Sequence, residues 1–148
     1  MSNTNTNKPV CMVIGAGAGI GGNVAKRFAK EGFHSVLCRR SNQHGMDDLI
    51  RDIEKEGGTA SGFLINAVEP ESIEKCVDKV ENEIGHIDTL VFNLGAQVGN
   101  KSLSETTYKI FELGWRLATF SLFRTASSVL PKMEKRGKGS FLVTTSTA

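Results

Sequence analysis

The chain has 148 residues, of which 39% are hydrophobic and 23% are charged, and its formal net charge is +2. This composition is typical of one globular domain and excludes a disordered chain. The near-neutral charge argues against a nucleic-acid-binding protein. No run of 18 apolar residues occurs in the sequence, which argues against a membrane-spanning segment.

Three cysteines are present, Cys11, Cys38 and Cys76. Their spacing matches neither a disulfide framework nor a metal site, so we expect no bound metal and a reducing compartment. Residues 1–9 are polar and lack the apolar stretch of a signal peptide, and we interpret them as a disordered tail. Together these features favour a cytoplasmic protein.

The first half of the chain alternates apolar strands with amphipathic helices. Val10–Ile14 is a β-prone apolar run, and a glycine-rich loop follows it. A helix then begins near Ile20 and is ended by Gly32. The next expected elements are a strand at His34–Cys38, a helix at Asp47–Glu56 and a strand at Ala60–Ile65.

In the second half, Pro70 is expected to open a helix that Gly85 closes, because proline is tolerated in a first helical turn. A long helix at about residues 105–135 is expected between strands at Thr89–Asn93 and Ser140–Thr144. Pro131 lies within its pattern and should kink or end it. The apolar face predicted for this helix consists of Phe111, Trp115, Ala118, Leu122, Ala126 and Val129.

Alternating strands and helices indicate right-handed βαβ units, which form a parallel sheet with helices on both faces. We therefore predict an α/β fold with a doubly wound parallel sheet, the Rossmann fold, as a single domain at residues 10–148. Such sheets bind ligands at the carboxyl ends of their strands, and the glycine-rich loop lies at one of these ends.

Residues 15–21 of that loop read Gly-Ala-Gly-Ala-Gly-Ile-Gly. Glycine permits a tight turn and a close approach of the backbone to a pyrophosphate, and the following helical turn offers free N–H groups to that anion. An ordinary strand–helix turn is the alternative. Within a βαβ frame the pattern predicts a dinucleotide site formed by Gly15, Gly17, Gly19, Ile20 and Gly21.

The second predicted strand is followed by Arg39 and Arg40. An NAD-binding fold usually has Asp or Glu near this point, which accepts a hydrogen bond from the ribose 2′-hydroxyl. A guanidinium cannot accept that bond but pairs well with a 2′-phosphate. Arg39, supported by Arg40, therefore predicts NADP(H) in preference to NAD(H). The alternative is that both arginines are exposed loop charges.

With these motifs the sequence resembles the short-chain dehydrogenase/reductase family. The family's loop is Thr-Gly-x-x-x-Gly-x-Gly, and only its leading Thr is replaced here, by Ile14. The resemblance implies that Asn66 and Ala67 lie at the adenine, where the family usually has an Asp and an apolar residue. It also implies that Asn93 and Gly95, which match part of the family's Asn-Asn-Ala-Gly, lie near the adenosine ribose. A turn-forming Asn93 is the alternative.

The end of the chain extends the resemblance. Residues 129–133, Val-Leu-Pro-Lys-Met, match a common ending of the family's long helix. Counting back from Pro131 puts Ala118 where the family has the Asn of its catalytic tetrad, and alanine cannot relay a proton. The last strand leads to Ser146, which the resemblance assigns as the serine that hydrogen-bonds the substrate's carbonyl or hydroxyl. A strand-end serine bound to backbone is the alternative.

The family's acid/base pair, Tyr-x-x-x-Lys, does not occur in these 148 residues, because Tyr108 is the only tyrosine and no lysine lies four positions after it. General acid–base help contributes about 10²–10⁴ in rate, so we expect these residues alone to be inactive or very slow. The family's pair lies beyond the serine, so we also expect the sheet to be incomplete on its C-terminal side.

Three interpretations remain. The first is the amino-terminal part of an NADP(H)-dependent oxidoreductase that acts on a carbonyl or alcohol substrate. The second is a non-catalytic, nucleotide-binding short form that associates with full-length subunits. The third is a partial gene product that does not fold stably. Because the family is usually dimeric or tetrameric, the resemblance also implies a homo-oligomer.

Overall fold

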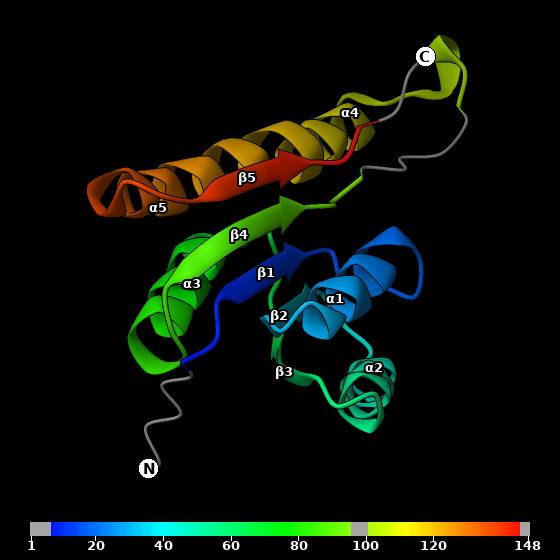
Figure 1. The fold of residues 1–148 in the computed structure, drawn as a ribbon. Helices are drawn as coiled ribbons and strands as arrows, with labels where there is room; N and C mark the ends of the chain where they lie inside the picture. Colours follow the sequence, from blue (N-terminus) through cyan, green and yellow to red (C-terminus); the bar gives the residue numbers. More distant parts are fainter. Residues whose placement is uncertain (1–6, 96–100, 146–148) are drawn as a thin grey trace.

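The computed structural model describes residues 7–95 and 101–145 (Figure 1). Its strands form one sheet in the order β3-β2-β1-β4-β5, and every neighbouring pair is parallel. The strands match their predicted ranges to within two residues, and the predicted α/β fold is confirmed. They are β1 (Val10–Ile14), β2 (His34–Arg39), β3 (Thr59–Leu64), β4 (Ile87–Phe92) and β5 (Ser140–Val143).

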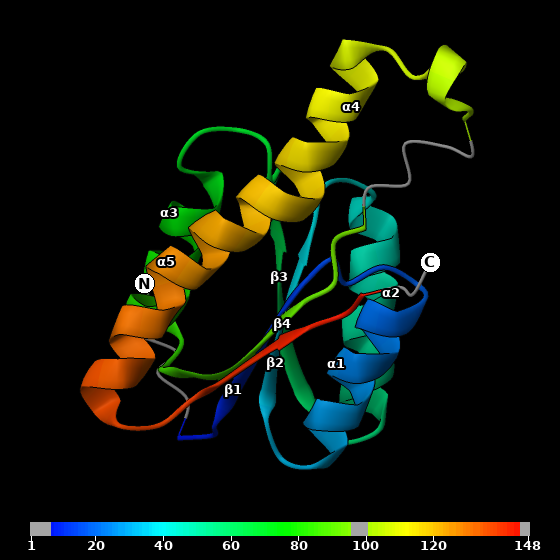
Figure 2. The ribbon, with the colours of Figure 1, turned by 90° about the horizontal axis from the view of Figure 1, so that it is seen from above.

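Helices cover both faces of the sheet (Figure 2). One face carries α1 (Ile20–Lys30) and α2 (Gln43–Lys55), and the other carries α3 (Ser72–Glu83) and α5 (Ser121–Arg136). The chain moves outward in one direction from β1 to β3 and then returns to place β4 on the other side of β1. The switch point of the sheet is therefore next to β1, and the glycine loop follows that strand.

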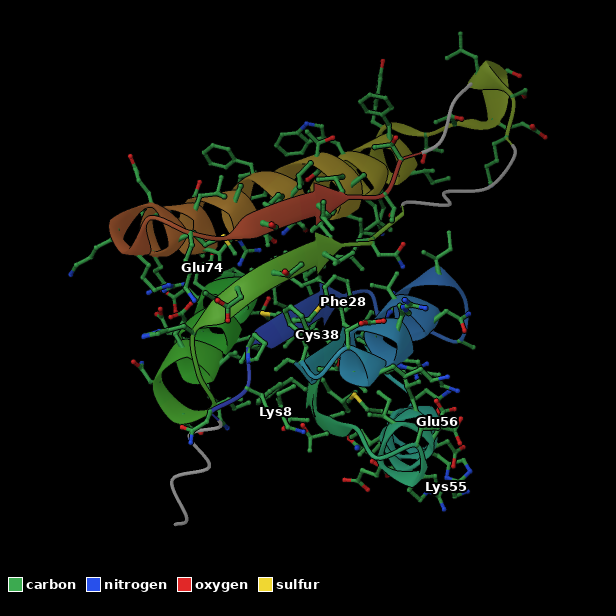
Figure 3. All side chains as sticks on the ribbon, viewed as in Figure 1. Lys8, Phe28, Cys38, Lys55, Glu56 and Glu74 are labelled. Atoms are coloured by element: carbon green, nitrogen blue, oxygen red, sulfur yellow. The ribbon has the colours of Figure 1, made fainter. Side chains whose placement is uncertain are left out.

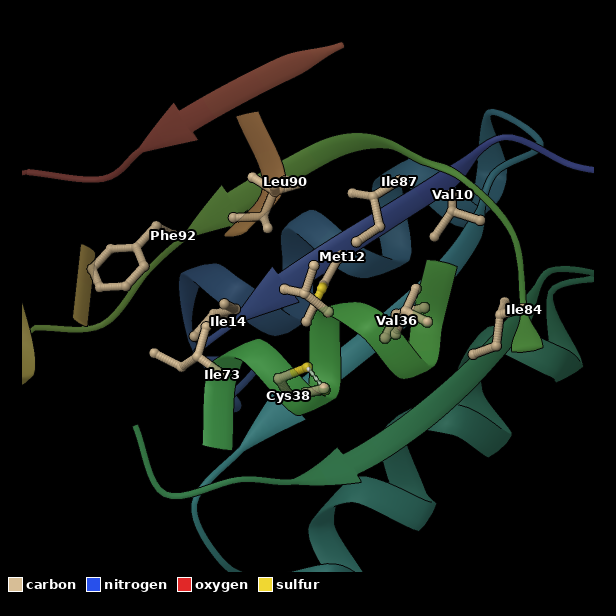
Figure 4. Packing of buried hydrophobic residues seen from close by; sticks show 14 of the residues in the cluster. Val10, Met12, Ile14, Val36, Cys38, Ile73, Ile84, Ile87, Leu90 and Phe92 are labelled. Carbon is tan, nitrogen blue, oxygen red and sulfur yellow. Dashed lines mark hydrogen bonds between the residues drawn. The ribbon is translucent and has the colours of Figure 1, made fainter. Parts of the chain in front are cut away.

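Alternate side chains of the central strands fill two core layers. Met12 and Ile14 of β1 pack with residues of α3 and α5, as the close-up of this layer shows for Met12, Ile14 and Ile73 (Figure 4). Cys11 and Val13 point to the other layer, where α1 and α2 contribute apolar residues. Full burial of one such aliphatic side chain stabilises the fold by about 1.5–3 kcal/mol.

Two helices begin at other residues than predicted. Helix α2 begins at Gln43 instead of Asp47, because the Asn42 side chain accepts a hydrogen bond from the Gly45 N–H at 2.9 Å and caps an earlier turn. Helix α3 begins at Ser72 instead of Pro70. There the Ser72 hydroxyl donates to the Asn66 carbonyl at 2.6 Å, which holds the preceding residues in a turn.

The long helix consists of three consecutive segments after a short 3₁₀ turn, η1 (Leu103–Glu105). These are α4 (Tyr108–Trp115), a π-helical segment, η2 (Arg116–Phe120), and α5. Pro131 lies inside α5, which continues to Arg136, so the expectation that Pro131 could end the helix is wrong. Ion pairs from Lys132 to Asp78 and from Arg136 to Glu81 tie this part of α5 to α3.

The predicted apolar face of this helix is only partly buried. Val129 is buried, but the side chains of Phe111 and Trp115 are 67% and 48% exposed. The first half of the helix buries Gly114 and Ser121 instead. The π-helical segment explains the difference, because its wider turn breaks the 3.6-residue spacing on which the prediction rested.

Residues 1–6 of the expected tail lie outside the described residues. At its end, the carbonyl of Pro9 accepts a hydrogen bond from the His34 N–H at 2.8 Å. The last residue of the predicted tail therefore joins the sheet. In the described ranges, no helix has the length and apolarity needed to cross a bilayer.

Candidate functional site

A cleft of about 280 Å³ opens at the carboxyl edge of the sheet, between the glycine loop, the end of β2 and the first half of α2. Gly17 and Arg39 line it, together with Asn42. Arg39 also lines a second pocket of about 30 Å³. The predicted residues Gly15, Arg40, Asn66 and Ala67 line this second pocket. Two groups of predicted residues thus meet at Arg39.

The glycine loop is anchored to β2 by its own backbone. The N–H groups of Gly15 and Ala16 both donate to the Cys38 carbonyl, at 2.8 and 2.9 Å. Gly15 has a φ of +95°, which a residue with a Cβ rarely adopts. A Cβ on Gly21 would lie 2.2 Å from the Gly15 carbonyl oxygen. Glycine at both positions therefore lets the loop turn back against the start of α1.

The first turn of α1 presents unused backbone donors. No described group accepts a hydrogen bond from the N–H of Gly19, Ile20 or Gly21. Free N–H groups and the helix dipole together favour an anion at this point. Ile20 is 63% exposed, so its side chain does not cover these donors. The predicted pyrophosphate site thus has the donors that an anion requires.

Arg39 is the only predicted cofactor residue that lines both pockets. No described group pairs with its guanidinium or accepts a hydrogen bond from it. Two carboxylates also line the cleft, but Asp52 pairs with Lys26 at 2.7 Å and Asp48 pairs with Arg51. Because other cations hold these carboxylates, the charge of Arg39 is left for a ligand.

Gly45 makes room for the Arg39 side chain. A Cβ at Gly45 would lie 3.2 Å from Arg39 Nη1 and 2.8 Å from Asn42 Nδ2. Asn42 itself has a left-handed φ of 69°, which Asn tolerates better than most residues. Neither residue was predicted from the sequence, although an Asn directly before a helix is a signal for such a cap.

The second pocket is formed by the loop that follows β3. Asn66 and Ala67 lie there beside Leu94 and Leu117. The Asn66 amide donates to Glu69 Oε1 at 3.0 Å, and its oxygen accepts from the Val68 N–H at 3.4 Å. The surface of this pocket is mainly apolar, and the side chains of Arg39, Arg40 and Asn66 lie at it as well.

Asn93 is engaged at both ends of its side chain. Its amide donates to the Gly15 carbonyl at 3.0 Å, and its oxygen accepts from the Thr144 hydroxyl at 2.8 Å. It therefore ties the glycine loop to the end of β5, and sequence analysis missed Thr144 as its partner. Gly95 is exposed at the end of a described range. The predicted catalytic residue Ser146 lies outside the described residues.

Neither Tyr108 nor Ala118 lines the cleft. Tyr108 is 97% exposed at the start of α4, away from the cleft lining. Ala118 lies in the π-helical segment. The described residues contain no cluster of metal-ligating side chains.

The three cysteines are free and buried. Burial raises the pKa of Cys11 from 9.0 to about 12. A hydrogen bond with Cys76, at a sulfur–sulfur distance of 3.8 Å, and burial together raise the pKa of Cys38 (Figures 3 and 4). Thiols with raised pKa values are poor nucleophiles, so Cys11 and Cys38 serve the core.

The fold and the position of the glycine loop define the class of protein, an α/β domain of the dinucleotide-binding type. The family model described as short chain dehydrogenase matches residues 9–148. The chain belongs to this family of oxidoreductases.

Relatives of known activity agree with this assignment. The chain is 32% identical over 139 residues to a 7alpha-hydroxysteroid dehydrogenase of Escherichia coli (strain K12), covering 93% of this chain and 53% of the relative. A solved 7 alpha-hydroxysteroid dehydrogenase with NADH and 7-oxo glycochenodeoxycholic acid aligns with a TM-score of 0.87 and 29% identity, over 97% of this chain and 55% of that one.

A variant of actinorhodin polyketide ketoreductase, solved with NADPH, aligns with a TM-score of 0.85 and 27% identity, over 94% of this chain and 54% of that one. Structures with NADH and with NADPH thus both occur among the neighbours. The chain spans about half the length of the relatives that it matches.

Proposed function

We propose that the chain is the nucleotide-binding part of an NADP(H)-dependent oxidoreductase that acts on a carbonyl or alcohol. The observation that carries the NADP(H) preference is the guanidinium of Arg39, which faces a cleft with no described partner. A ribose 2′-phosphate supplies the missing anion, whereas the 2′-hydroxyl of NAD does not. Arg40 adds a second positive charge at the same strand end.

The remaining cofactor contacts follow the order of the chain. The free N–H groups at the start of α1 hold the pyrophosphate. Glycine at positions 15 and 21 keeps the loop compact, and Gly17 lines the cleft beside it. Asn66 and Ala67 contact the adenine. Asn93 holds the loop near the adenosine ribose through its bond to the Gly15 carbonyl, with Gly95 beside it. When bound, the cofactor supplies the hydride chemistry.

The NADP(H) preference can be tested by fluorescence titration of the purified chain with NADPH and with NADH. We expect NADPH to bind at least about tenfold more tightly, since a charge-assisted hydrogen bond contributes about 1.5–3 kcal/mol. Arg39→Gln should remove this preference. Arg27→Gln is the matched control, because it deletes an arginine of α1 whose side chain is 74% exposed. NADH that binds as tightly as NADPH contradicts the preference.

For catalysis we propose Ser146 as the hydroxyl that hydrogen-bonds the substrate oxygen. It cannot replace the missing proton donor, because a serine hydroxyl ionises with difficulty near neutral pH. Ala118 supplies no proton relay in the long helix. These 148 residues alone should therefore bind the cofactor and turn over a carbonyl substrate very slowly.

The second candidate is a nucleotide-binding chain without catalysis, which associates with full-length subunits. The observation that favours it is the exposed position of Tyr108, the one tyrosine of these 148 residues, which does not line the cleft. The two candidates differ in the intact mass of the protein in its source cells. A mass near 16.0 kDa supports the second candidate, and a longer chain that carries the Tyr-x-x-x-Lys pair contradicts it.

We further propose that the chain forms a homo-oligomer through the long helix, where Phe111 and Trp115 are exposed. Contiguous exposed apolar surface of this kind is typical of a protein interface. The free, buried cysteines fit a reducing compartment, for which we propose the cytoplasm.

A further inference from the structure

The long helix donates three hydrogen bonds to the loop that follows β3. Arg124 Nη1 donates to the Ala67 carbonyl at 2.8 Å, and the Ser121 hydroxyl donates to the same carbonyl at 3.2 Å. Arg116 Nη2 donates to the next carbonyl, that of Val68, at 2.9 Å. These donors come from more than 45 residues away in the sequence.

Arg124 is held in place by an ion pair. Its guanidinium contacts both oxygens of Glu74, at 2.8 and 2.5 Å, and Figure 3 labels Glu74 on α3 beneath the long helix. The Arg124 side chain is only 9% exposed. The hydrogen bond from Arg124 lowers the pKa of Glu74, so the pair stays charged at neutral pH. A bidentate guanidinium has little freedom to leave its carboxylate.

The π-helical segment brings the helix to the pocket itself. The Ser121 N–H donates to the Arg116 carbonyl across the wide turn, and the Ser121 hydroxyl donates to the same oxygen at 2.7 Å. Within this turn, Leu117 lines the pocket that also contains Asn66 and Ala67. One segment of the helix therefore forms a wall of the pocket and fixes the loop opposite that wall.

We propose that Arg124 is a positioning residue for the adenine end of the cofactor, which it orients through the Ala67 carbonyl. Arg124 reaches no ligand itself. It fixes the distance between the loop that carries Ala67 and the side chain of Leu117, and this distance sets the width of the pocket. The inference rests on the proposed function, because it takes the pocket of Asn66 and Ala67 to be the adenine site.

The chain offers a matched control at the other end of the same two helices. Arg136 contacts both oxygens of Glu81, at 2.9 and 3.1 Å, and also donates to the Ile87 carbonyl at 3.0 Å. Like Arg124, it links α5 to a glutamate of α3 and to one backbone carbonyl. Ile87 begins β4, so the contacts of Arg136 lie at the opposite edge of the sheet from the cleft.

The test compares Arg124→Met with Arg136→Met. Both variants lose a guanidinium that is at most 17% exposed and has the same kinds of contacts, so both should unfold at lower urea concentration than the unchanged chain. Only Arg124→Met should weaken NADPH binding, by about tenfold, and it should weaken binding of 2′,5′-ADP, which lacks the nicotinamide, by the same factor. Equal dissociation constants for the two variants overturn the proposal.

Hydrogen exchange gives a second measurement that general destabilisation does not reproduce. Arg124→Met should speed exchange in residues 66–72 and leave exchange in residues 84–88 as it is in the unchanged chain. Arg136→Met should do the reverse. Uniform acceleration of both segments in both variants overturns the proposal.

Arg116→Met covers the case in which Arg124→Met does not fold, because Arg116 is half-buried and, among the described residues, its side chain bonds to the Val68 carbonyl alone. It should also weaken binding of NADPH and of 2′,5′-ADP, by a smaller factor. Unchanged binding would contradict the proposal that the bonds from the long helix to this loop position the cofactor. An unchanged chain that binds neither ligand overturns the proposed function, and this inference with it. Binding that is insensitive to Arg116 and Arg124 overturns this inference alone.

Discussion

Gly17 and Gly21 lie in the same loop, but steric crowding requires glycine only at the second position. A Cβ on Gly21 would lie 2.2 Å from the Gly15 carbonyl oxygen and 2.9 Å from Asn93 Nδ2. A Cβ on Gly17 would meet nothing within 4 Å. The sequence shows glycine at both positions, and only the structure shows that a Cβ is tolerated at one and excluded at the other.

Gly21→Ala should therefore lower the free energy of unfolding by about 1–3 kcal/mol, because the added methyl group forces the backbone of the loop to shift. Gly17→Ala should change it by less than about 0.5 kcal/mol. Urea denaturation of both variants measures the difference. A loss of equal size in the two variants contradicts this account of the loop.

Ionisation of the Cys11 thiol should make the free energy of unfolding depend on pH in the alkaline range. The pKa of this thiol is about 12 in the folded chain, against an ordinary value of 9.0. Above pH 9 the unfolded chain loses this proton and the folded chain keeps it. Ionisation then favours unfolding, so stability is full below pH 9 and falls as pH rises towards 12, by up to about 1.4 kcal/mol per pH unit.

Urea denaturation at about pH 8 and about pH 10 tests this dependence on the ionisation of the Cys11 thiol. Cys11→Ala is expected to lose less stability over this interval than the unchanged chain, by on the order of 1 kcal/mol. Cys38, whose pKa is also raised, remains in both proteins, so the difference between them reports Cys11. An identical loss in both proteins contradicts the assignment.

At the scale of elements, the start of α2 depends on one side chain. Asn42 caps the helix through the Gly45 N–H and adopts a left-handed backbone conformation. Asn42→Ala removes the cap and puts a Cβ-bearing residue without a polar side chain in that conformation. It should lower the free energy of unfolding by about 1–2 kcal/mol.

The control for this prediction is Asn42→Gly, since glycine accepts a left-handed conformation and costs only a few tenths of a kcal/mol at this helix position. Thermal or urea unfolding of the two variants measures the difference between their free energies of unfolding. A glycine variant that is as unstable as the alanine variant contradicts the part that the left-handed backbone conformation plays in this prediction.

The long helix shows which features of an element a sequence pattern can predict. Its extent is a local feature, and its three segments run from Tyr108 to Arg136, close to the predicted range of about 105–135. Its buried face is not local, because the π-helical segment arises where Ser121 bonds to the Arg116 carbonyl and to the Ala67 carbonyl. A partner 54 residues away leaves no periodic signal in the sequence.

At the scale of the whole molecule, the side of the long helix away from the sheet is apolar. Phe111 and Phe123 are 67% and 65% exposed, and the rings of Trp115 and Phe120 stack at 5.3 Å. Desolvation of such aromatic surface is a common source of association energy. The proposed homo-oligomer would bury this surface against a second copy of the chain.

Light scattering after size-exclusion chromatography tests this interface. The unchanged chain should elute as a dimer or larger species, and the double variant Phe111→Glu with Phe123→Glu should be monomeric, because two buried carboxylates would oppose association. Lys109→Glu, an exposed change on the same helix, is the control and should leave the oligomer intact. A monomeric unchanged chain contradicts the proposed homo-oligomer.

The sequence by itself determined the order of strands and helices, the parallel α/β class and the family resemblance. Hydrophobic periodicity, glycine stops and the loop at residues 15–21 are local features, and the structure and the family match confirm what they predicted. Arg39 was also visible at its strand end. Its preference for NADP(H) stays a prediction.

Only the tertiary structure decided which groups support this site. Asn93 holds the Gly15 carbonyl across 78 residues, and Arg124 holds the Ala67 carbonyl across 57. Sequence analysis placed Asn93 near the ribose but did not find its bond to the loop, and it gave Arg124 no role. The physical reason is that buried donors are satisfied by whatever carbonyl the packed helices and strands bring within reach. Such partners are set by the arrangement of distant segments.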